Sequence, residues 1–216
     1  RAALLQSREG IRQRVRKLGR GLASIVLVCG LALFAGERYV PIHYWLADQR
    51  TATGEQRTLK LADGTLINLN THSAVDVRFD EKQRRVILQE GEILVETAHG
   101  DARPFIVETR EGSMRALGTR FVVKRQGDTT VLSMLQSRVA AQSANEQQTL
   151  EVSAGSRALI RQGSVELAGS ISPASIDQAW ERHQLVVEDQ PLPQVLDEIS
   201  RHRRGHLQFD RNTLAG

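Results

Sequence analysis

Hydrophobic residues follow three different patterns along the 216-residue chain. From Gly21 to Gly36, sixteen residues pass without a charge, which is typical of a helix inside a membrane or a protein core. From Thr51 to Ser170, apolar residues mostly alternate with polar ones, as in strands that bury one face. After Pro191 the apolar spacing becomes that of an amphipathic helix. The pattern therefore predicts three parts with different structures.

The uncharged segment and its flank, residues 21–46, are interpreted as a transmembrane helix. Sixteen residues are slightly fewer than the ~20 that span the hydrocarbon core. Arg20 can extend to the interface at one end, and Tyr44 and Trp45 supply interfacial rings at the other. Residues 1–20 hold seven cations and one acid, so this basic stub is placed in the cytoplasm. We therefore expect a single-pass protein of the bacterial inner membrane with its bulk in the periplasm.

Two alternatives to a retained anchor stay open. A cleaved signal peptide also has a basic start and a short apolar run. Cleavage after Ala35 would put Leu33 three residues before the cut, where a small side chain is preferred, and cleavage after Gly36 would put Phe34 there. A buried core helix explains the apolar run but not the one-sided charge. Cys29 is the single cysteine, so no intrachain disulfide is possible.

The net charge of +4 invites a nucleic-acid partner, but the position of the charge argues against one. Setting the stub aside leaves 22 basic and 24 acidic residues after Arg20, a net charge of −2. Aromatic residues are only 4% of the chain and do not interleave with the basic run, so the stacking platforms of nucleic-acid binders are missing. No nucleic acid is expected as a partner.

Short alternating segments predict many strands in the module from Thr51 to Ser170. Turn signals separate them, among them Asp63-Gly64, Glu90-Gly91 and Gly127-Asp128. Short strands at close spacing imply a mainly β fold, as an all-β sandwich, a barrel or a short solenoid. The apolar positions expected on the buried faces are Leu59/Leu61, Val75/Val77/Phe79, Val86/Leu88, Ile93/Val95, Phe105/Val107, Phe121/Val123 and Val131/Ser133/Leu135.

Residues 171–216 are interpreted as a linker followed by an incomplete β-α-β unit. The Ser/Gly-rich stretch Gly169–Ser172 is typical of a linker. Leu185–Glu188 predicts a strand, Pro191–Arg203 an amphipathic helix and Leu207–Phe209 a second strand. The pattern stops there, so we expect the unit to be incomplete. Because the first residue is not methionine, we also expect the sequence to be part of a longer protein.

Four motifs, in their order and spacing, resemble the FecR family of transmembrane sigma-factor regulators. They are Thr58–Asn70 (TLKLADGTLINLN), Arg84–Thr97 (RRVILQEGEILVET), Arg103–Val107 (RPFIV) and Ala116–Val123 (ALGTRFVV). One departure is Ser137, where the family usually has glycine, and it leaves the turn geometry there open. From Trp180 onward the chain is similar to the C-terminal part of FecR-type regulators, which resembles the short N-terminal domain of secretins and TonB-dependent receptors.

This resemblance implies a function and its partners. It implies an anti-sigma regulator of the inner membrane whose periplasmic part senses the signalling domain of an outer-membrane TonB-dependent receptor for ferric siderophores. An ECF sigma factor would be held by a cytoplasmic helical domain ahead of Arg1. Periplasmic and intramembrane proteases are further implied partners, and Gly21, Gly30 and Gly36 would make the span easy to unwind for the latter. Whether the regulator activates or inhibits stays open.

Candidate chemistry is sparse. No Ser/His/Asp constellation, phosphate loop or Cys/His metal spacing stands out. Asp63 and Asp101 lack the alternating oxygen ligands of a calcium loop, and turn formation explains them. We therefore expect no cofactor and no metal, and no enzyme in the usual sense.

Gly118-Thr119 is the exception. A threonine hydroxyl can attack the preceding carbonyl carbon when the peptide is strained, and glycine leaves that carbon open. The resemblance points to the same bond, since some family members are cut between such a Gly and Thr. The alternative is that Gly118 is a bulge or turn residue leading into the strand at Phe121.

Two other function classes stay open. The first is a membrane-anchored module that binds peptidoglycan or another envelope component, and the second is a hydrolase, which has little support beyond Gly118-Thr119. The sequence upstream of Arg1 separates the regulator from the envelope-binding module, because only the regulator requires a helical sigma-binding domain there.

Overall fold

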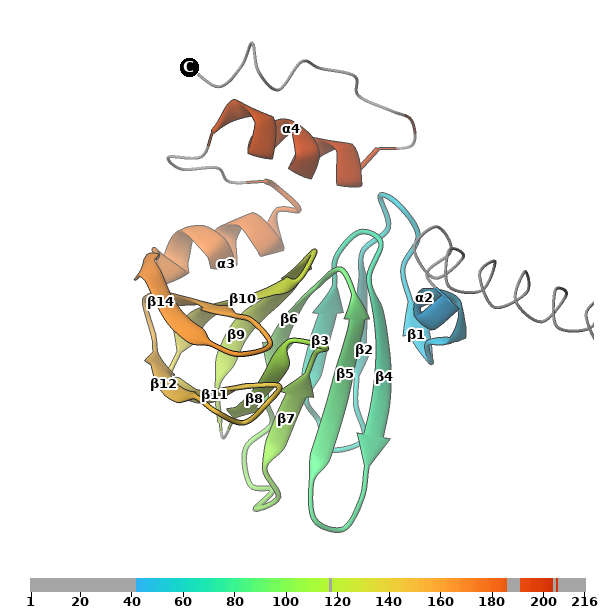
Figure 1. Ribbon diagram of the computed structural model, residues 1–216. Coiled ribbons are helices and arrows are strands. Elements are labelled where there is room, and N and C mark those ends of the chain that lie inside the picture. The colour runs from blue at the N-terminus through green and yellow to red at the C-terminus, as the bar shows by residue number, and fades with distance from the viewer. Residues whose placement is uncertain (1–41, 117, 186–190, 204, 206–216) are drawn as a thin grey trace, which may run out of the picture. The chain divides into compact units, whose positions relative to one another are not determined.

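The computed structural model describes residues 42–116, 118–185, 191–203 and 205, and shows a mainly β protein (Figure 1). The described part from residue 43 to residue 205 belongs to one compact unit. Its helices are α2 (Ile42–Leu46), α3 (Pro173–Glu181) and α4 (Leu192–Arg201). Its strands are β1 (Gln49–Arg50), β2 (Arg57–Lys60), β3 (Leu66–Leu69), β4 (Ala74–Phe79), β5 (Arg84–Glu90), β6 (Glu92–Glu96), β7 (Phe105–Glu108), β8 (Gly112–Ala116), β9 (Arg120–Gln126), β10 (Thr129–Gln136), β11 (Arg138–Ser143), β12 (Thr149–Ser153), β13 (Ser156–Ile160) and β14 (Val165–Ser170).

These strands form two seven-stranded sheets. The order in the first sheet is β1-β4-β5-β7-β8-β11-β12, and in the second it is β14-β13-β10-β9-β6-β3-β2. Neighbours such as β9 and β10 are antiparallel, whereas β5 and β7 are parallel. The predicted turns are confirmed at Gly64, Gly91 and Gly127, which have φ of 88°, 89° and 58°. Glycine adopts this left-handed conformation at low cost. The mainly β prediction is confirmed, and the fold is the sandwich among the predicted alternatives.

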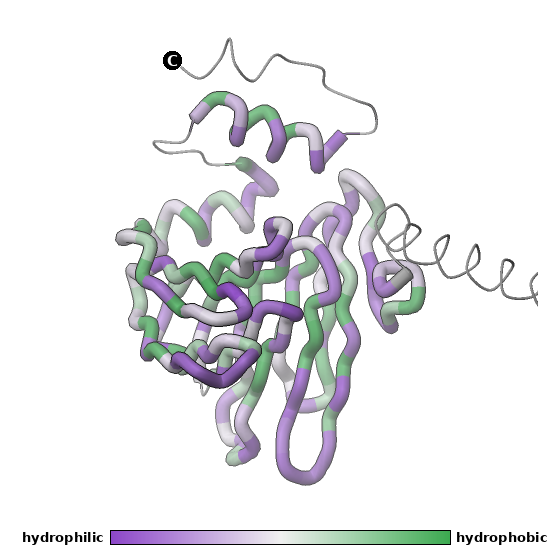
Figure 2. The backbone as a smooth tube through the Cα atoms, in the orientation of Figure 1, coloured by the Kyte–Doolittle hydropathy of each residue, from purple (hydrophilic) through white to green (hydrophobic). Residues whose placement is uncertain are grey.

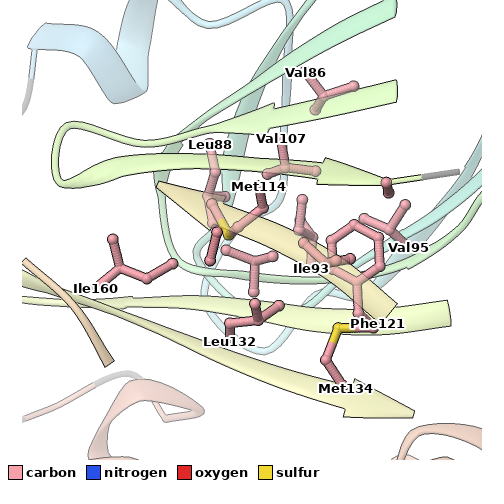
Figure 3. Close-up of a cluster of buried hydrophobic side chains, with 14 of the residues drawn as sticks. Val86, Leu88, Ile93, Val95, Val107, Met114, Phe121, Leu132, Met134 and Ile160 are labelled. Carbon is pink, nitrogen blue, oxygen red and sulfur yellow. The ribbon is translucent and has the colours of Figure 1, made fainter. Parts of the chain in front are cut away.

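The core lies between the two sheets. Figure 3 shows side chains of the first sheet facing those of the second across this space. The hydropathy alternates along many strands in Figure 2, as expected when one face is buried. Each buried aliphatic side chain contributes about 1.5–3 kcal/mol, so the core is the main source of stability. Its fully buried large residues include Ile67, Leu69, Leu88, Ile93, Phe105, Met114, Phe121, Leu132, Met134 and Ile160.

Strand β10 corrects one part of the sequence prediction. The positions predicted to face the core were Val131, Ser133 and Leu135. Instead, Leu132 and Met134 belong to the core between the sheets. Leu135 forms a second, smaller cluster with Leu94 and Val122. The prediction was wrong because both faces of this strand are buried, so its apolar positions do not reveal which face meets the other sheet.

Helix α3 covers the second cluster, against which Ile176 and Trp180 pack. The helix begins directly after Gly169–Ser172, the stretch interpreted as a linker, of which Gly169 and Ser170 end β14. The Ser172 side chain caps it by accepting a hydrogen bond from the Ser175 N–H at 3.3 Å, and Pro173 fits its first turn. The sequence analysis did not predict this helix, because a serine followed by proline signals a helix start as well as a loop.

The predicted amphipathic helix is confirmed as α4. Its Glu198 is only 8% exposed and forms an ion pair with Lys124 of β9 at 2.5 Å. Thr71 Oγ1 also donates a hydrogen bond to the Arg201 carbonyl oxygen at 3.1 Å. Burial alone would raise the pKa of Glu198, but the charges of Lys124 and Arg201 outweigh it and the pKa is lowered. These contacts dock α4 on the second sheet.

The turn at Ser137, where the resembled family usually has glycine, has the geometry that glycine would supply. Ser137, between β10 and β11, has φ of 64°, and its carbonyl oxygen accepts a hydrogen bond from the Ala154 N–H at 2.8 Å. The left-handed conformation costs a residue with a side chain about 1–2 kcal/mol. The substitution therefore preserves the turn but strains it.

Several predicted segments lie outside the described residues, namely the apolar segment 21–36, most of the strand Leu185–Glu188 and the strand Leu207–Phe209. Among the residues that are described, no helix is long and apolar enough to cross a membrane. Tyr44, predicted as an interfacial ring, is buried: its hydroxyl donates to the Thr51 carbonyl oxygen at 2.7 Å, and its ring stacks on His72.

Candidate functional site

The Gly118-Thr119 bond lies where the chain passes from one sheet to the other. Strand β8 ends at Ala116 in the first sheet, and β9 begins at Arg120 in the second. Gly118 has φ of 65°, a conformation that favours glycine. The prediction that Gly118 is a turn residue before the strand is therefore confirmed. A turn at Gly118 is compatible with a reactive Gly118-Thr119 bond.

Thr119 is fixed through its backbone by Thr97, the residue after β6. The Thr119 N–H donates to Thr97 Oγ1 at 2.7 Å. In return, the Thr97 N–H and Oγ1 donate to the Thr119 carbonyl oxygen at 3.0 Å and 3.2 Å. The Thr119 Oγ1 is buried and has no hydrogen-bond partner among the described residues. Because an unpaired buried hydroxyl costs about 1–3 kcal/mol, this one calls for an explanation.

The imidazole of His99 lies against Gly118. A methyl group placed on the Gly118 α-carbon would be 3.3 Å from His99 Nε2 and 3.4 Å from its Cδ2. The His99 ring forms no hydrogen bond or ion pair with the residues that the structure describes. An imidazole thus lies beside Gly118, and the next residue carries a buried hydroxyl without a partner. We call Thr97, His99, Gly118 and Thr119 the Gly118 site.

A buried arginine supports the loop that carries His99. Arg84 of β5 is fully buried, and its guanidinium donates to the Asp63 carboxylate and to the Arg103 carbonyl oxygen, each at 2.7 Å. Asp101 lies 3.7 Å from Arg84 Nε and forms an ion pair with Arg103 at 2.6 Å. We call these four residues the Arg84 network.

Both aspartates of this network are held in their charged form. Burial would raise the pKa of Asp63, but hydrogen bonds from Thr65 and Arg84 outweigh it and lower that pKa. Hydrogen bonds from the Arg103 side chain and backbone lower the pKa of Asp101 to about 2. Asp63 and Asp101, which were considered as calcium ligands, thus lie in one network, and their partners are the guanidinium groups of Arg84 and Arg103. Among the described residues, no group of three His, Cys, Asp or Glu side chains could hold a metal ion.

Comparison with known proteins identifies the kind of protein that carries this site. The profile of the family described as FecR protein matches residues 47–166, more than half of the chain. The chain belongs to the FecR family. Two crystal structures of a candidate anti-sigma factor from Parabacteroides distasonis ATCC 8503, at 1.65 Å and 2.50 Å resolution, share its fold with a TM-score of 0.62. The sequence in these structures is 22% identical to this chain, and the match covers 71% of this chain and 73% of theirs. At this identity the likeness shows the fold alone. No match was found among curated proteins.

The region that matches the FecR family contains the whole Gly118 site. Sequence reasoning found Gly118 and Thr119 but missed His99 and Thr97. No local signal could have found these two, because they approach Gly118 only when β6 and the loop after it pack beside the start of β9.

A pocket lies on the outer face of the second sheet of this FecR-family sandwich. It has a volume of about 410 Å³ and is lined by β2, β3 and the end of α3, including Thr58, Asn68 and Trp180. Its lining is mixed, since it includes the charged residues Arg57 and Glu181 as well as Trp180. Such a lining fits a polypeptide surface better than a small apolar ligand.

The pocket borders the edge of the second sheet, where β2 is the outermost strand. The Leu61 N–H donates to the Thr65 carbonyl oxygen at 2.9 Å across the β2-β3 turn. Because hydrogen-bonded pairs alternate along antiparallel strands, the N–H groups of Thr58 and Lys60 point away from β3. This edge therefore presents two backbone donors next to the pocket.

Proposed function

We propose that this FecR-family protein is a signal transducer of the bacterial inner membrane. In this proposal its periplasmic sandwich senses the signalling domain of a TonB-dependent receptor for ferric siderophores, and its cytoplasmic side controls an ECF sigma factor. The observation that carries the proposal is the family match over residues 47–166. The fold shared with a candidate anti-sigma factor supports a sigma factor as the partner.

The membrane orientation is the first part to test. The cations of residues 1–20 precede the apolar segment, which supports a cytoplasmic stub and a periplasmic sandwich. We expect alkaline phosphatase fused after Trp45, which is active only in the periplasm, to be active, and β-galactosidase at the same position to be inactive. The reverse pattern would refute the orientation.

The β2 edge is the surface that we assign to the receptor. A strand of the receptor domain would pair with the outward N–H groups of Thr58 and Lys60, while the adjacent pocket accepts one of its side chains. This mode of binding uses backbone hydrogen bonds, so it depends on the N–H group at residue 58 more than on the threonine side chain.

Cross-linking in cells tests this assignment. A photoreactive residue at Lys60 should capture the signalling domain of a TonB-dependent receptor, whereas one at Arg138, which is exposed on the other sheet, should not. Thr58→Pro removes one outward donor and should reduce the capture from Lys60. Thr58→Ala keeps the donor and should not. Equal capture from both positions, or equal loss in both Thr58 variants, would contradict strand addition at β2.

A second function, self-cleavage of the Gly118-Thr119 bond in a single turnover, is favoured by the unpaired Thr119 hydroxyl. Attack of Oγ1 on the Gly118 carbonyl carbon closes a five-membered ring and leads to an ester, which water hydrolyses. Thr119→Ser keeps a nucleophile and should still be cut. Thr119→Val has the same shape without the hydroxyl and should stay whole. Cleavage of the valine variant at this bond would exclude the mechanism.

A further inference from the structure

We propose that His99 is the proton-transfer residue for cleavage of the Gly118-Thr119 bond, and that the Arg84 network positions it. This inference rests on the proposed self-cleavage and deepens it. A hydroxyl attacks slowly unless a base removes its proton, and the peptide nitrogen leaves poorly unless it receives one. The site must therefore contain a group that can do both.

His99 lies beside Gly118, the residue whose carbonyl carbon would be attacked. Its Nε2 lies 3.3 Å from the place that a methyl group on the Gly118 α-carbon would take, and this α-carbon is bonded to the carbonyl carbon that is attacked. Thr119 Oγ1 is buried without a hydrogen-bond partner, and the imidazole likewise has none among the described residues. The two groups that would exchange a proton thus both lack a protein partner among the described residues, and one belongs to Thr119 while the other lies beside Gly118. Imidazole is also the side chain best suited to accept and return a proton near neutral pH.

The Thr119 Oγ1 lone pair forms a bond to the Gly118 carbonyl carbon, while His99 Nε2 takes the hydroxyl proton and the carbonyl π pair moves to oxygen. When this intermediate collapses, the C–N bond breaks, its electron pair goes to the Thr119 nitrogen, and His99 returns the proton there. The ester then reacts with one water molecule, giving a Gly118 carboxylate and a new N-terminus at Thr119.

The Arg84 network explains how a loop residue is held for this task. On one side of His99, the Ala98 N–H donates to Thr65 Oγ1 at 3.1 Å, and that hydroxyl donates to Asp63 at 2.7 Å. On the other side, the Asp101 carboxylate accepts hydrogen bonds from the backbone and side chain of Arg103. Arg84 links the two sides through Asp63 and Asp101. A buried ion pair is weak evidence for stability in itself. The role that we assign to the Arg84 network is instead to fix both ends of the loop that carries His99.

The test uses the full-length chain made by cell-free synthesis into lipid nanodiscs, with the fragment that begins at Thr119 followed over time by mass spectrometry. His99→Gln keeps the size and polarity of the side chain but cannot act as a base at neutral pH. We expect cleavage at least about 100-fold slower than in the wild type. His43→Gln, at an exposed histidine of α2, is the matched control and should be cut at the wild-type rate.

Chemical rescue separates proton transfer from a structural role. His99→Ala opens space beside Gly118, so added imidazole should restore part of its cleavage rate but should have no effect on Thr119→Val. A slow His99 variant that imidazole does not rescue would overturn the proton-transfer role, as would a His99→Gln chain cut at the wild-type rate. A wild-type chain that stays whole would instead refute the self-cleavage proposal itself.

Discussion

Replacing Arg84 by methionine is the sharpest test of the buried network. The guanidinium is fully buried and contacts the Asp63 carboxylate, of which only 2% is exposed. Methionine fills much of the same volume but leaves this carboxylate without its cation. Removing one partner of a buried ion pair costs about 3–5 kcal/mol. Asp63 keeps two hydrogen bonds from Thr65, so we expect a loss near the lower end, about 3 kcal/mol.

The loss should depend on pH in a defined direction. The native pKa of Asp63 is lowered, so its contribution is present above the unfolded pKa of about 3.9 and is lost as the pH falls through the native value. The difference between wild type and Arg84→Met should therefore be largest near neutral pH and should shrink below about pH 4. The double variant Arg84→Met/Asp63→Asn removes the unpaired charge and should recover part of the loss.

Urea unfolding followed by tryptophan fluorescence measures these differences, because the Trp180 ring packs on the sandwich. All variants should carry Thr119→Val so that the chain stays whole. A loss below about 1 kcal/mol at neutral pH, or one that does not change with pH, would show that the pair does not contribute as its burial implies.

Three further predictions concern other parts of the sandwich. Ser137→Gly should stabilise the domain by about 0.5–1 kcal/mol, since it relieves a left-handed serine; a lower urea midpoint would contradict this. Trp180→Ala should cost about 2 kcal/mol and speed hydrogen exchange in α3, because its ring packs against the cluster of Leu94, Val122 and Leu135; unchanged exchange would contradict the docking. Lys124→Met should leave Glu198 less well paired and speed exchange in α4 but not in α3, and equal change in both helices would count against it.

The strands and turns could be predicted from the sequence because period-two alternation and glycine turns are local signals. Val86 and Leu88 of β5 illustrate this, since both face the core as expected. The inward face of β10 could not be predicted, because α3 buries the other face and Leu132 and Leu135 are both apolar. The start of α3 was hidden for a related reason, as its Ser-Pro signal also occurs in loops.

The candidate site was predictable only in its reactive bond. Gly118 and Thr119 are adjacent in sequence, so their chemistry can be proposed from local pattern. Arg84 offered a weaker signal, since it lies in phase with Val86 on the buried face of β5 and so requires a buried anion. His99 offered none, because its approach to Gly118 depends on tertiary packing between segments about twenty residues apart.

The regulator proposal is tested most directly by measuring transcription in the bacterium that makes this protein. Residues 51–216 would be deleted, leaving the stub, the apolar segment and whatever precedes them in place. The account predicts that transcripts sharing one ECF-type promoter lose their response to ferric siderophore, while other transcripts do not change. An unaltered response to siderophore after the deletion would contradict the claim that this FecR-family sandwich carries the signal.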